Sequence, residues 1–558
     1  MPGGLLNIAA YGAENLILTG NPTKTFFNAT YKKYTNFGLQ RFRIEHEGQR
    51  SLNFNSQTEL NFKIPRYAEL LWDTYLVVNL PDIWSPLYWT QDVSGCQTPY
   101  EFKWIDKLGA MMIEEVTIYA GSNILSRYSG EYIESCIQRD DSGKRILWNR
   151  MIGSENRFNN PANSFQNGGF YPNANFNTTP SDGFSGSDVQ PSIKGKRLFI
   201  PLEAWFTYGG AKTALPLVAL QYQEINIKIR FRSIKELYTI LNVQNPDPIT
   251  GRGERTAPNP ASTIDQLYWF LQPPQDASGV FPTNPQTQEN KNNMARYIKK
   301  NNWDTDIHLL GCYVFLSQDE RRVFASNKHT YLVKETFQHD FLNTAGSKRV
   351  DIPCRDMVSS FMFRFRRSDV NLRNEWSNYT NWKFKGVQAV QPIDMTDNCS
   401  GAINPYLFKQ TGPLVDSSNL ENILLDMGIL LGAEYRENTL YEGVYNLVEK
   451  WIRTDGRAKN GLYTYNFSVR SARDSYQPSG AQNMNKWQYA TFEFNTIQPP
   501  LDPSNNNVEV LCDPSGGIIG VRKDTWRLNK WNFDLRVWED RYNMIVIENG
   551  SIGLLIAR

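Results

Sequence analysis

Neighbouring carboxylates are the side chains of this sequence that could do acid–base chemistry, because two such groups can divide the roles of proton donor and base. They occur as Glu114-Glu115, Asp140-Asp141, Asp319-Glu320 and Glu539-Asp540. Successive residues of a strand point to opposite faces, so we expect Glu114 and Glu115 not to converge. Carboxylates that a fold brings together from distant strands leave no pattern in the sequence. A carbohydrate-binding or carbohydrate-active β-sandwich protein therefore stays as an alternative.

Other catalytic and cofactor patterns are missing from the sequence. It has no G-x-x-x-x-G-K-[ST], H-E-x-x-H or G-x-S-x-G motif, and its four histidines offer little material for a triad or a metal site. The six cysteines form no C-x-x-C pair, which favours buried free thiols in a reducing compartment. We therefore predict a protein that is not an enzyme and has no cofactor or metal.

Six Asn-x-Ser/Thr triplets could in principle accept a glycan. Asn177 has the most exposed setting, in a long loop rich in Asn, Gly, Ser and Pro. The chain is rich in asparagine and lacks a secretory signal, so chance is the better explanation for these triplets.

Length and composition indicate more than one β-rich domain. At 558 residues the chain exceeds a single compact core. Aromatic residues make up 13%, with 38 Gly and 29 Pro, which suits short strands separated by many loops. The 59 basic and 57 acidic residues nearly cancel, so no overall field selects nucleic acid or a membrane.

Alternating apolar and polar residues predict the strands. Residues 225–231 alternate strictly between Ile or Phe and Asn, Lys or Arg. In the second half Phe361, Phe363 and Phe365 alternate with Met362, Arg364 and Arg366. No βαβ alternation and no long amphipathic helix occurs. Antiparallel sandwiches with long connections are therefore the expected all-β architecture, and jelly rolls are the foremost candidates.

Three segments are predicted to interrupt these strands. Thr98 to Glu101 fits a capping box, so a short helix is expected from there to about Leu108. Residues 140–195 and 241–303 are rich in Asn, Pro and Gln or Gly and are expected to form long outer loops.

A short helix is expected to link the two β-rich halves, over residues 317–329. Ser317 and Glu320 fit the capping box S-x-x-E, in which the serine hydroxyl meets the backbone N–H three residues on. We predict that Phe324 packs between the two halves. Arg321 and Arg322 should pair with nearby carboxylates or backbone carbonyls.

The N-terminal region carries an uninterrupted run of positive charge. From Asn15 to Ile44 the charged residues are Lys24, Lys32, Lys33, Arg41 and Arg43, with no acid among them. This run is a basic surface for an acidic partner or, equally well, a solvated strand edge guarded by Lys and Arg.

Five ordered stretches resemble the major capsid proteins of nucleocytoplasmic large DNA viruses, above all those of large algal and amoebal viruses. They are LTGNPTKTFFNATYKKYTNF at 18–37, LPLVALQYQEINIKIRF at 215–231, YVFLSQDERRVFASNKHTYLVKE at 313–335, GLYTYNFSVRSARDSYQPSGAQNMNKWQYATFEF at 461–494 and YNMIVIENGSIGLL at 542–555. They span nearly the whole chain, and their order is more specific than any single stretch.

The resemblance implies two consecutive eight-stranded antiparallel jelly rolls. It places an N-terminal arm at 1–23, the first roll at 24–316, the linker helix at 317–329 and the second roll at 330–558. It also implies a homotrimeric capsomer of pseudo-hexagonal outline that tiles an icosahedral virus shell.

The resemblance further implies partners and a location. Neighbouring capsomers, minor capsid or cement proteins and an inner membrane surface would contact the protein, without specific nucleic-acid binding. The protein would be made and assembled in the host cytoplasm and reside in the virion. Attachment to a host through the long loops is a third hypothesis, in which receptor binding would fall to those loops alone.

Overall fold

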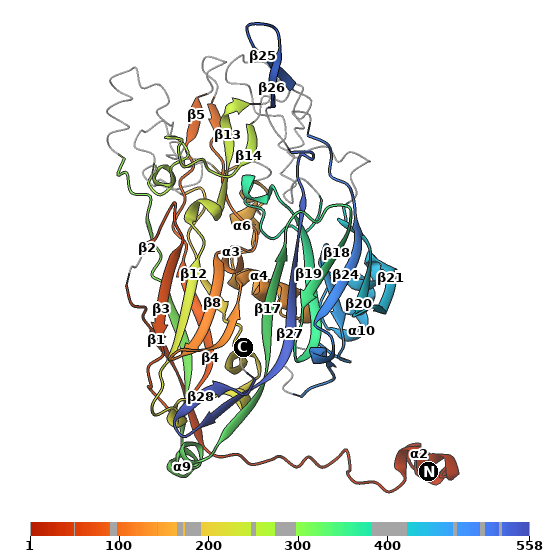
Figure 1. Cartoon of the computed structure of the whole chain (residues 1–558). Coiled ribbons are helices and arrows are strands. Elements are labelled where there is room, and N and C mark those ends of the chain that lie inside the picture. Colours follow the sequence, from red (N-terminus) through yellow and green to blue (C-terminus); the bar gives the residue numbers. More distant parts are fainter. Residues whose placement is uncertain are drawn as a thin grey trace.

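The computed structural model of the chain shows two β-rich bodies side by side and a long N-terminal arm at one end (Figure 1). It describes residues 2–556 except 49–50, 90–96, 142, 165–170, 173, 175–190, 247–252, 274–296, 382–420, 472–476, 503–507 and 524–526. The arm contains the short helices α1 (Gly4–Ala9), η1 (Ala13–Asn15) and α2 (Leu16–Thr19). Among the described residues, none of the helices has the length and apolar character needed to cross a membrane.

The first roll consists of two antiparallel sheets around a common core. One sheet has the order β1 (Phe37–Ile44), β16 (His308–Leu316), β4 (Leu70–Asn79), β10 (Arg197–Pro201), with β11 (Leu215–Pro216) also paired to β4; the other has the order β3 (Thr58–Lys63), β12 (Ile225–Phe231), β8 (Ile113–Ala120), β9 (Asn123–Tyr128). In β12 every Ile and Phe is buried and every residue between them is half-buried. The period of two therefore places the apolar side chains in the core, as predicted.

The second roll repeats this plan. One sheet has the order β17 (His329–Phe341), β27 (Phe533–Glu548), β19 (Met357–Arg367), β22 (Leu462–Asn466), with β23 (Gln482–Asn483) and β28 (Ser551–Leu554) at its margins; the other has the order β18 (Ser347–Pro353), β24 (Tyr489–Thr496), β20 (Leu424–Leu431), β21 (Glu434–Tyr441). Leaving out β11, β23 and β28, each roll has eight strands, and the predicted all-β double jelly roll is confirmed.

The sheet that contains β19 is buried on both faces and fuses the two rolls. Phe361, Phe363 and Phe365 belong to the core of the second roll. Met362 and Trp538, on the opposite face, belong to the core cluster that fills the first roll. We call the region between the rolls, on this second face, the seam.

Short sheets extend the upper ends of the rolls in Figure 1, or close their margins. They are β14 (Gly253–Thr256)-β13 (Tyr238–Pro246)-β7 (Phe102–Trp104), β5 (Leu87–Trp89)-β6 (Gln97–Pro99), β15 (Trp303–Asp304)-β2 (Ser51–Leu52) and β25 (Val508–Cys512)-β26 (Ile518–Lys523). The helix predicted from Thr98 to Leu108 is therefore wrong. Phe102 and Trp104 are buried in strand β7, and Glu101 pairs with Arg255 instead of capping a helix.

Helices lie between strands and in the predicted loops. They include α3 (Leu108–Met111), α4 (Gly130–Asp140), α5 (Arg145–Met151), α6 (Asn156–Asn159), η2 (Pro161–Asn163), α7 (Trp205–Tyr208), η3 (Ala211–Thr213), η4 (Leu217–Ala219), η5 (Ile234–Glu236), η6 (Leu267–Trp269), α9 (Gln318–Ser326), η7 (Val370–Leu372), η8 (Val444–Val448), α10 (Glu449–Arg453) and η9 (Met484–Lys486). The prediction of a structureless segment from 140 is thus wrong up to residue 163, where buried Trp148 and Phe158 anchor helices.

Candidate functional site

Helix α4 occupies the seam between the two rolls (Figure 1). It begins after Ser129, whose backbone is extended and whose hydroxyl oxygen accepts a hydrogen bond from the Tyr132 N–H at 3.3 Å. All residues from Gly130 to Arg139 are buried. Gly130 is required by a close approach, because a Cβ there would lie 1.9 Å from the carbonyl oxygen of Ala110. A helix buried in this way needs partners from the surrounding strands for each of its charges.

Near its N-terminus, α4 carries a carboxylate surrounded by three arginines of the second roll. Arg364 Nε donates to Glu131 Oε1 at 2.6 Å, and Arg536 Nη1 donates to Glu131 Oε2 at 2.6 Å. Arg366 lies 3.5 Å from the same carboxylate, which is 2% exposed. Burial alone would raise the pKa of Glu131, but the guanidinium groups of Arg364, Arg536 and Arg366 hold it well below its ordinary value.

Aromatic rings complete the surroundings of these arginines. The guanidinium carbon of Arg366 lies 5.5 Å from the Trp376 ring, and that of Arg364 lies 5.5 Å from the Tyr379 ring. Burial, together with Arg364 and other cations, lowers the pKa of Arg366 to about 9. Cation–π contacts stabilise guanidinium groups that have lost their water, so the ring layer supports the excess of positive charge here.

At the C-terminal end of α4 the polarity of the contact is reversed. Arg139 Nη1 donates to Asp540 Oδ2 of strand β27 at 2.9 Å, and both side chains are 1% exposed. Tyr132 Oη also donates to Asp540 at 2.8 Å, as do Thr336 at 3.1 Å and Ser360 at 3.2 Å. A cation in the last turn of a helix is favoured by the helix dipole. The helix therefore contacts the second roll through an acid at one end and a base at the other.

The middle of α4 is fastened to the first roll. Trp148 Nε1 donates to Glu134 Oε2 at 2.6 Å, and Gln138 Nε2 donates to Glu134 Oε1 at 2.7 Å. Lys107 Nζ lies 3.7 Å from the same carboxylate. One helix thus holds partners in both rolls, and neither roll can rotate against the other without breaking buried hydrogen bonds.

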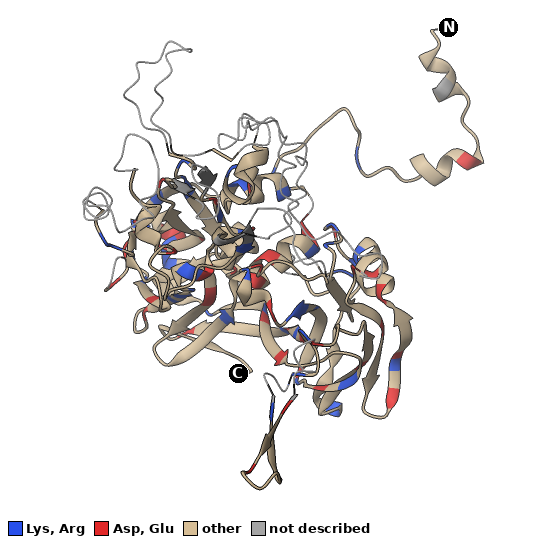
Figure 2. Cartoon of the chain, turned by 90° about the horizontal axis from the view of Figure 1, so that it is seen from above, with Lys and Arg blue, Asp and Glu red and all other residues tan. Residues whose placement is uncertain are grey.

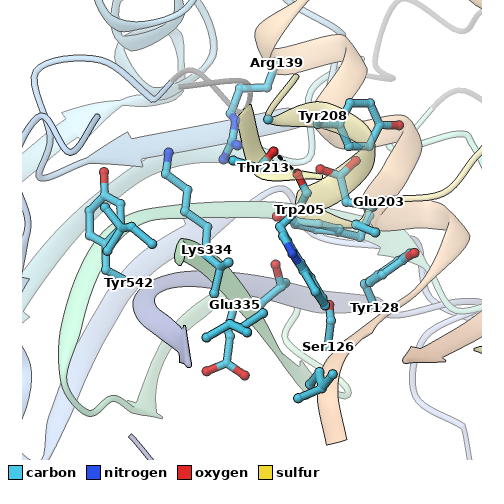
Figure 3. A pocket seen from close by; sticks show the side chains of 18 residues that line it. Ser126, Tyr128, Arg139, Glu203, Trp205, Tyr208, Thr213, Lys334, Glu335 and Tyr542 are labelled. Atoms are coloured by element: carbon cyan, nitrogen blue, oxygen red, sulfur yellow. Dashed lines mark hydrogen bonds between the residues drawn. The ribbon is translucent and has the colours of Figure 1, made fainter. Parts of the chain in front are cut away.

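A cavity of about 80 Å³ lies beside this helix, between the rolls. Figure 3 shows Lys334 and Tyr542 of the second roll on one side and Tyr128 and Trp205 of the first roll on the other. Burial, and then the nearby Arg139, lowers the pKa of Lys334. Ligand sites usually measure roughly 300–1,000 Å³, so this space suits a few waters rather than a sugar ring.

The adjacent carboxylates Glu114 and Glu115 share a structural partner. Glu114 and Glu115 both reach Arg230, at 3.1 and 3.5 Å, so the prediction that they would not converge is wrong. A register shift between Arg230 and Phe231 makes a bulge, which turns two successive side chains to one side. Both carboxylates therefore pair with the same cation, Arg230. No group of three or more His, Cys, Asp or Glu among the described residues could hold a metal ion.

The cysteines divide between the interior and the surface. Cys136, Cys312 and Cys354 are buried free thiols, as predicted, and burial raises the pKa of each. Cys512 is exposed on strand β25, which the sequence did not indicate. Cys96 and Cys399 lie outside the described residues, as does Asn177.

The predicted linker residues lie at the lower end of the molecule in Figure 1, away from the seam. Helix α9 forms there, but the Ser317 side chain makes no capping hydrogen bond. Arg321 lies 3.4 Å from Glu69, and Arg322 is exposed. Glu320 is half-buried rather than reaching back to a cap.

Phe324 contacts residues of the first roll and the first residue of strand β17, and its packing between the two rolls stays a prediction. It lies against a small cluster formed by Leu70, Ala214 and Val314, all from the first roll. Its ring also stacks on that of His329, with centroids 5.3 Å apart. Helix α9 thus covers the base of the first roll, and whether it clamps the two rolls stays a prediction.

The residues that do join the rolls were missed in the sequence. The signals that could have found α4 are the cap at Ser129 and the spacing of Tyr132, Ile133, Cys136 and Ile137, which share one helical face. The local sequence gives no sign that Glu131 is buried, because the arginines that pair with it lie more than 230 residues further along the chain.

Known proteins resemble the chain over most of its length. Residues 25–271 match the family model described as Major capsid protein N-terminus. The major capsid protein of Phaeocystis pouchetii virus is 23% identical over 93% of this chain and 99% of its own. That of Pyramimonas orientalis virus is 26% identical over 92% of this chain and 95% of its own. The crystal structure of PBCV-1 VP54 has a TM-score of 0.59 at 16% identity and covers 96% of this chain and 100% of its own.

Two eight-stranded rolls fused along one sheet define the class of this protein as a double jelly-roll protein. The chain is related over nearly its whole length to the major capsid proteins of large DNA viruses, as its sequence resemblance implied. Its function is structural, in the shell of a virus. The comparisons give no support to the carbohydrate-binding alternative.

Proposed function

We propose that three copies of this chain form a capsomer of pseudo-hexagonal outline, and that such capsomers tile an icosahedral shell without catalysing a reaction. The observation that carries the proposal is the fused seam. Two rolls of eight strands, held in one orientation by buried charges on α4, give each copy two similar lobes. Three copies about one axis then present six lobes, which is the outline that packs in a hexagonal array.

A rigid seam is needed for this outline. A hinge between the rolls would let the angle between the six lobes vary, and a regular array would lose its lattice contacts. Interfaces between domains are usually polar and permit motion unless they are large and apolar. Here one core cluster, including Met362, Trp376 and Trp538, continues from the first roll across the seam.

We further propose the division of the chain that this assembly implies. Residues 1–23 would be an arm, 24–316 the first roll, 317–329 the linker and 330–558 the second roll. The division is supported by strand pairing, because β1 to β16 pair only among themselves in the described residues, as do β17 to β28.

The lower end of the capsomer would meet partners inside the shell. The lower end in Figure 1, where the arm and α9 emerge, would face minor capsid proteins and an inner membrane inside the shell. Basic residues without acids from Asn15 to Ile44 support this orientation, because anionic surfaces attract such a segment. Assembly would take place in the host cytoplasm, without specific nucleic-acid binding.

The proposal is tested on the purified full-length chain. Sedimentation should give a particle of three times the 64.3 kDa chain mass, and electron microscopy at high concentration should show hexagonal arrays. A chain that stays monomeric at high concentration would overturn the proposal.

A further inference from the structure

The N-terminal arm exposes an apolar and basic surface that the rest of the chain does not cover. Phe26 and Phe27 are essentially fully exposed, and Tyr31 and Tyr34 are more than 80% exposed. Figures 1 and 2 show the arm extending away from both rolls. Lys24, Lys32 and Lys33 form no ion pair with the residues that the structure describes. Large exposed apolar segments of this kind mark interaction sites.

The outer flank of the second roll carries an apolar surface of its own. Helices η8 and α10 run continuously from Val444 to Arg453 beside strand β21. Their inner side is buried through Tyr445 and Lys450, whereas Trp451 is 89% exposed on the outer side. The exposed apolar residues of this flank are Tyr435, Tyr441, Leu447, Val448, Trp451 and Ile452. A tryptophan this exposed on a folded helix is typical of a binding hot spot.

The charges of the arm and the flank are opposite. Residues 434–453 contain four carboxylates, Glu434, Glu437, Glu442 and Glu449, and three bases, Arg436, Lys450 and Arg453. Lys450 is buried, so the surface of the flank keeps an excess of acid. Residues 15–44 contain five bases and no acid. Electrostatic complementarity of this kind steers association and selects the partner.

We propose that the arm of one copy binds the β21–η8–α10 flank of a second copy, with aromatic residues of the arm packed around Trp451. This inference rests on the proposed self-assembly of the chain. In a ring, contacts run head to tail, so the outer flank of one second roll faces the first roll of the next copy. The arm emerges from the base of that first roll, where Phe37 pairs with Leu316. An extended chain spans roughly 3.3 Å per residue, so the eleven residues from Phe26 to Phe37 reach about 36 Å from the base of the roll, which suffices for a flank that lies against that roll.

The site can be located by photo-crosslinking in the full-length chain. A benzophenone amino acid replaces Phe27, isotope-labelled and unlabelled copies are mixed, and the crosslinked peptides are mapped. Crosslinks should join residue 27 of one copy to residues 434–453 of another. The same photoreactive residue in place of Leu342, which is also exposed but lies in the second roll, should not mark that flank.

Variants identify which contacts matter. Trp451→Ser should lower the crosslink yield at least about tenfold, since an exposed tryptophan at the centre of an interface carries much of its binding free energy. Tyr222→Ser, an exposed aromatic residue elsewhere, should leave the yield unchanged. Lys32→Glu with Lys33→Glu should also reduce the yield, and Glu434→Lys with Glu442→Lys in the same chain should restore part of it.

Several outcomes would overturn the inference. They are crosslinks within a single copy, crosslinks that Trp451→Ser does not change, and an arm that is protected only by vesicles with anionic lipids. Sedimentation of the same samples separates the two proposals. A trimer without arm-to-flank crosslinks rejects this inference alone, whereas a monomer rejects the proposed assembly as well.

Discussion

The two connections between the rolls differ in kind. Helix α9 is the covalent connection, and none of its residues is buried. Helix α4 belongs to the first roll, yet every residue from Gly130 to Arg139 is buried and its end charges bind strands of the second roll. Chain continuity is therefore not what orients the rolls. The orientation comes from buried charges whose partners lie far away in the sequence, and such pairs tolerate little displacement.

The largest expected effect comes from removing the carboxylate at the start of α4. Glu131→Ala leaves the buried Arg364 and the half-buried Arg366 and Arg536 without their shared anion, which should lower the free energy of unfolding by about 3–5 kcal/mol. Urea denaturation followed by tryptophan fluorescence measures the loss. A cost below about 1 kcal/mol would show that water reaches these arginines and that the seam is not the rigid element.

A smaller loss of stability is expected from a substitution at Gly130, where α4 lies against the backbone of Ala110. Gly130→Ala places a Cβ 1.9 Å from the Ala110 carbonyl oxygen, so the helix must shift, at a cost of about 1–3 kcal/mol. Gly443→Ala is the matched control, because a Cβ there meets nothing within 4 Å. Replacing glycine by alanine normally stabilises a helix. Equal changes in unfolding free energy at the two sites would therefore contradict tight packing of α4.

Acid should weaken the seam through the same carboxylate. The folded-state pKa of Glu131 lies well below its ordinary value, so its contribution is fully present above the unfolded pKa of about 4.3. It is lost as the pH falls through the folded pKa. The stability difference between the wild type and Glu131→Gln should therefore be constant from pH 8 to pH 5 and shrink below pH 4. A difference that grows in acid would contradict this linkage.

The smallest effects are expected in α9. Ser317→Ala removes no capping hydrogen bond, and Arg321→Ala removes a pair in which the arginine is 61% exposed. Each should change the unfolding free energy by less than about 0.5–1 kcal/mol. A loss as large as that of Glu131→Ala, measured by the same urea titration, would make α9 the clamp after all.

The faces of strand β19 show how far the sequence could lead. Alternation correctly predicts that Phe361, Phe363 and Phe365 share one buried face. The same alternation indicates a polar opposite face, but Met362 and Arg364 on that face are also buried. Periodicity reveals that two faces differ, not what covers the second one. The partner of Arg364 is Glu131, and no local pattern connects them.

Local signals also failed where the long-range packing opposed them. Thr98 to Glu101 has the residues of a capping box, yet burial of Tyr100, Phe102 and Trp104 makes the segment extended. Glu114 and Glu115 converge because a bulge, set by the pairing of β8 with β12, interrupts the alternation. In the first case the burial of three aromatic side chains outweighs one capping hydrogen bond.

By itself, the sequence determined the strands, the two β-rich halves and the family, because alternation and ordered motifs are properties of neighbouring residues. Only the tertiary structure decided which sheet faces the seam and that α4 lies within the seam. It also decided that Glu131 and Arg139 bind the second roll. Arg139 and Asp540 are 401 residues apart, and a buried ion pair forms only once the whole fold has excluded water from both.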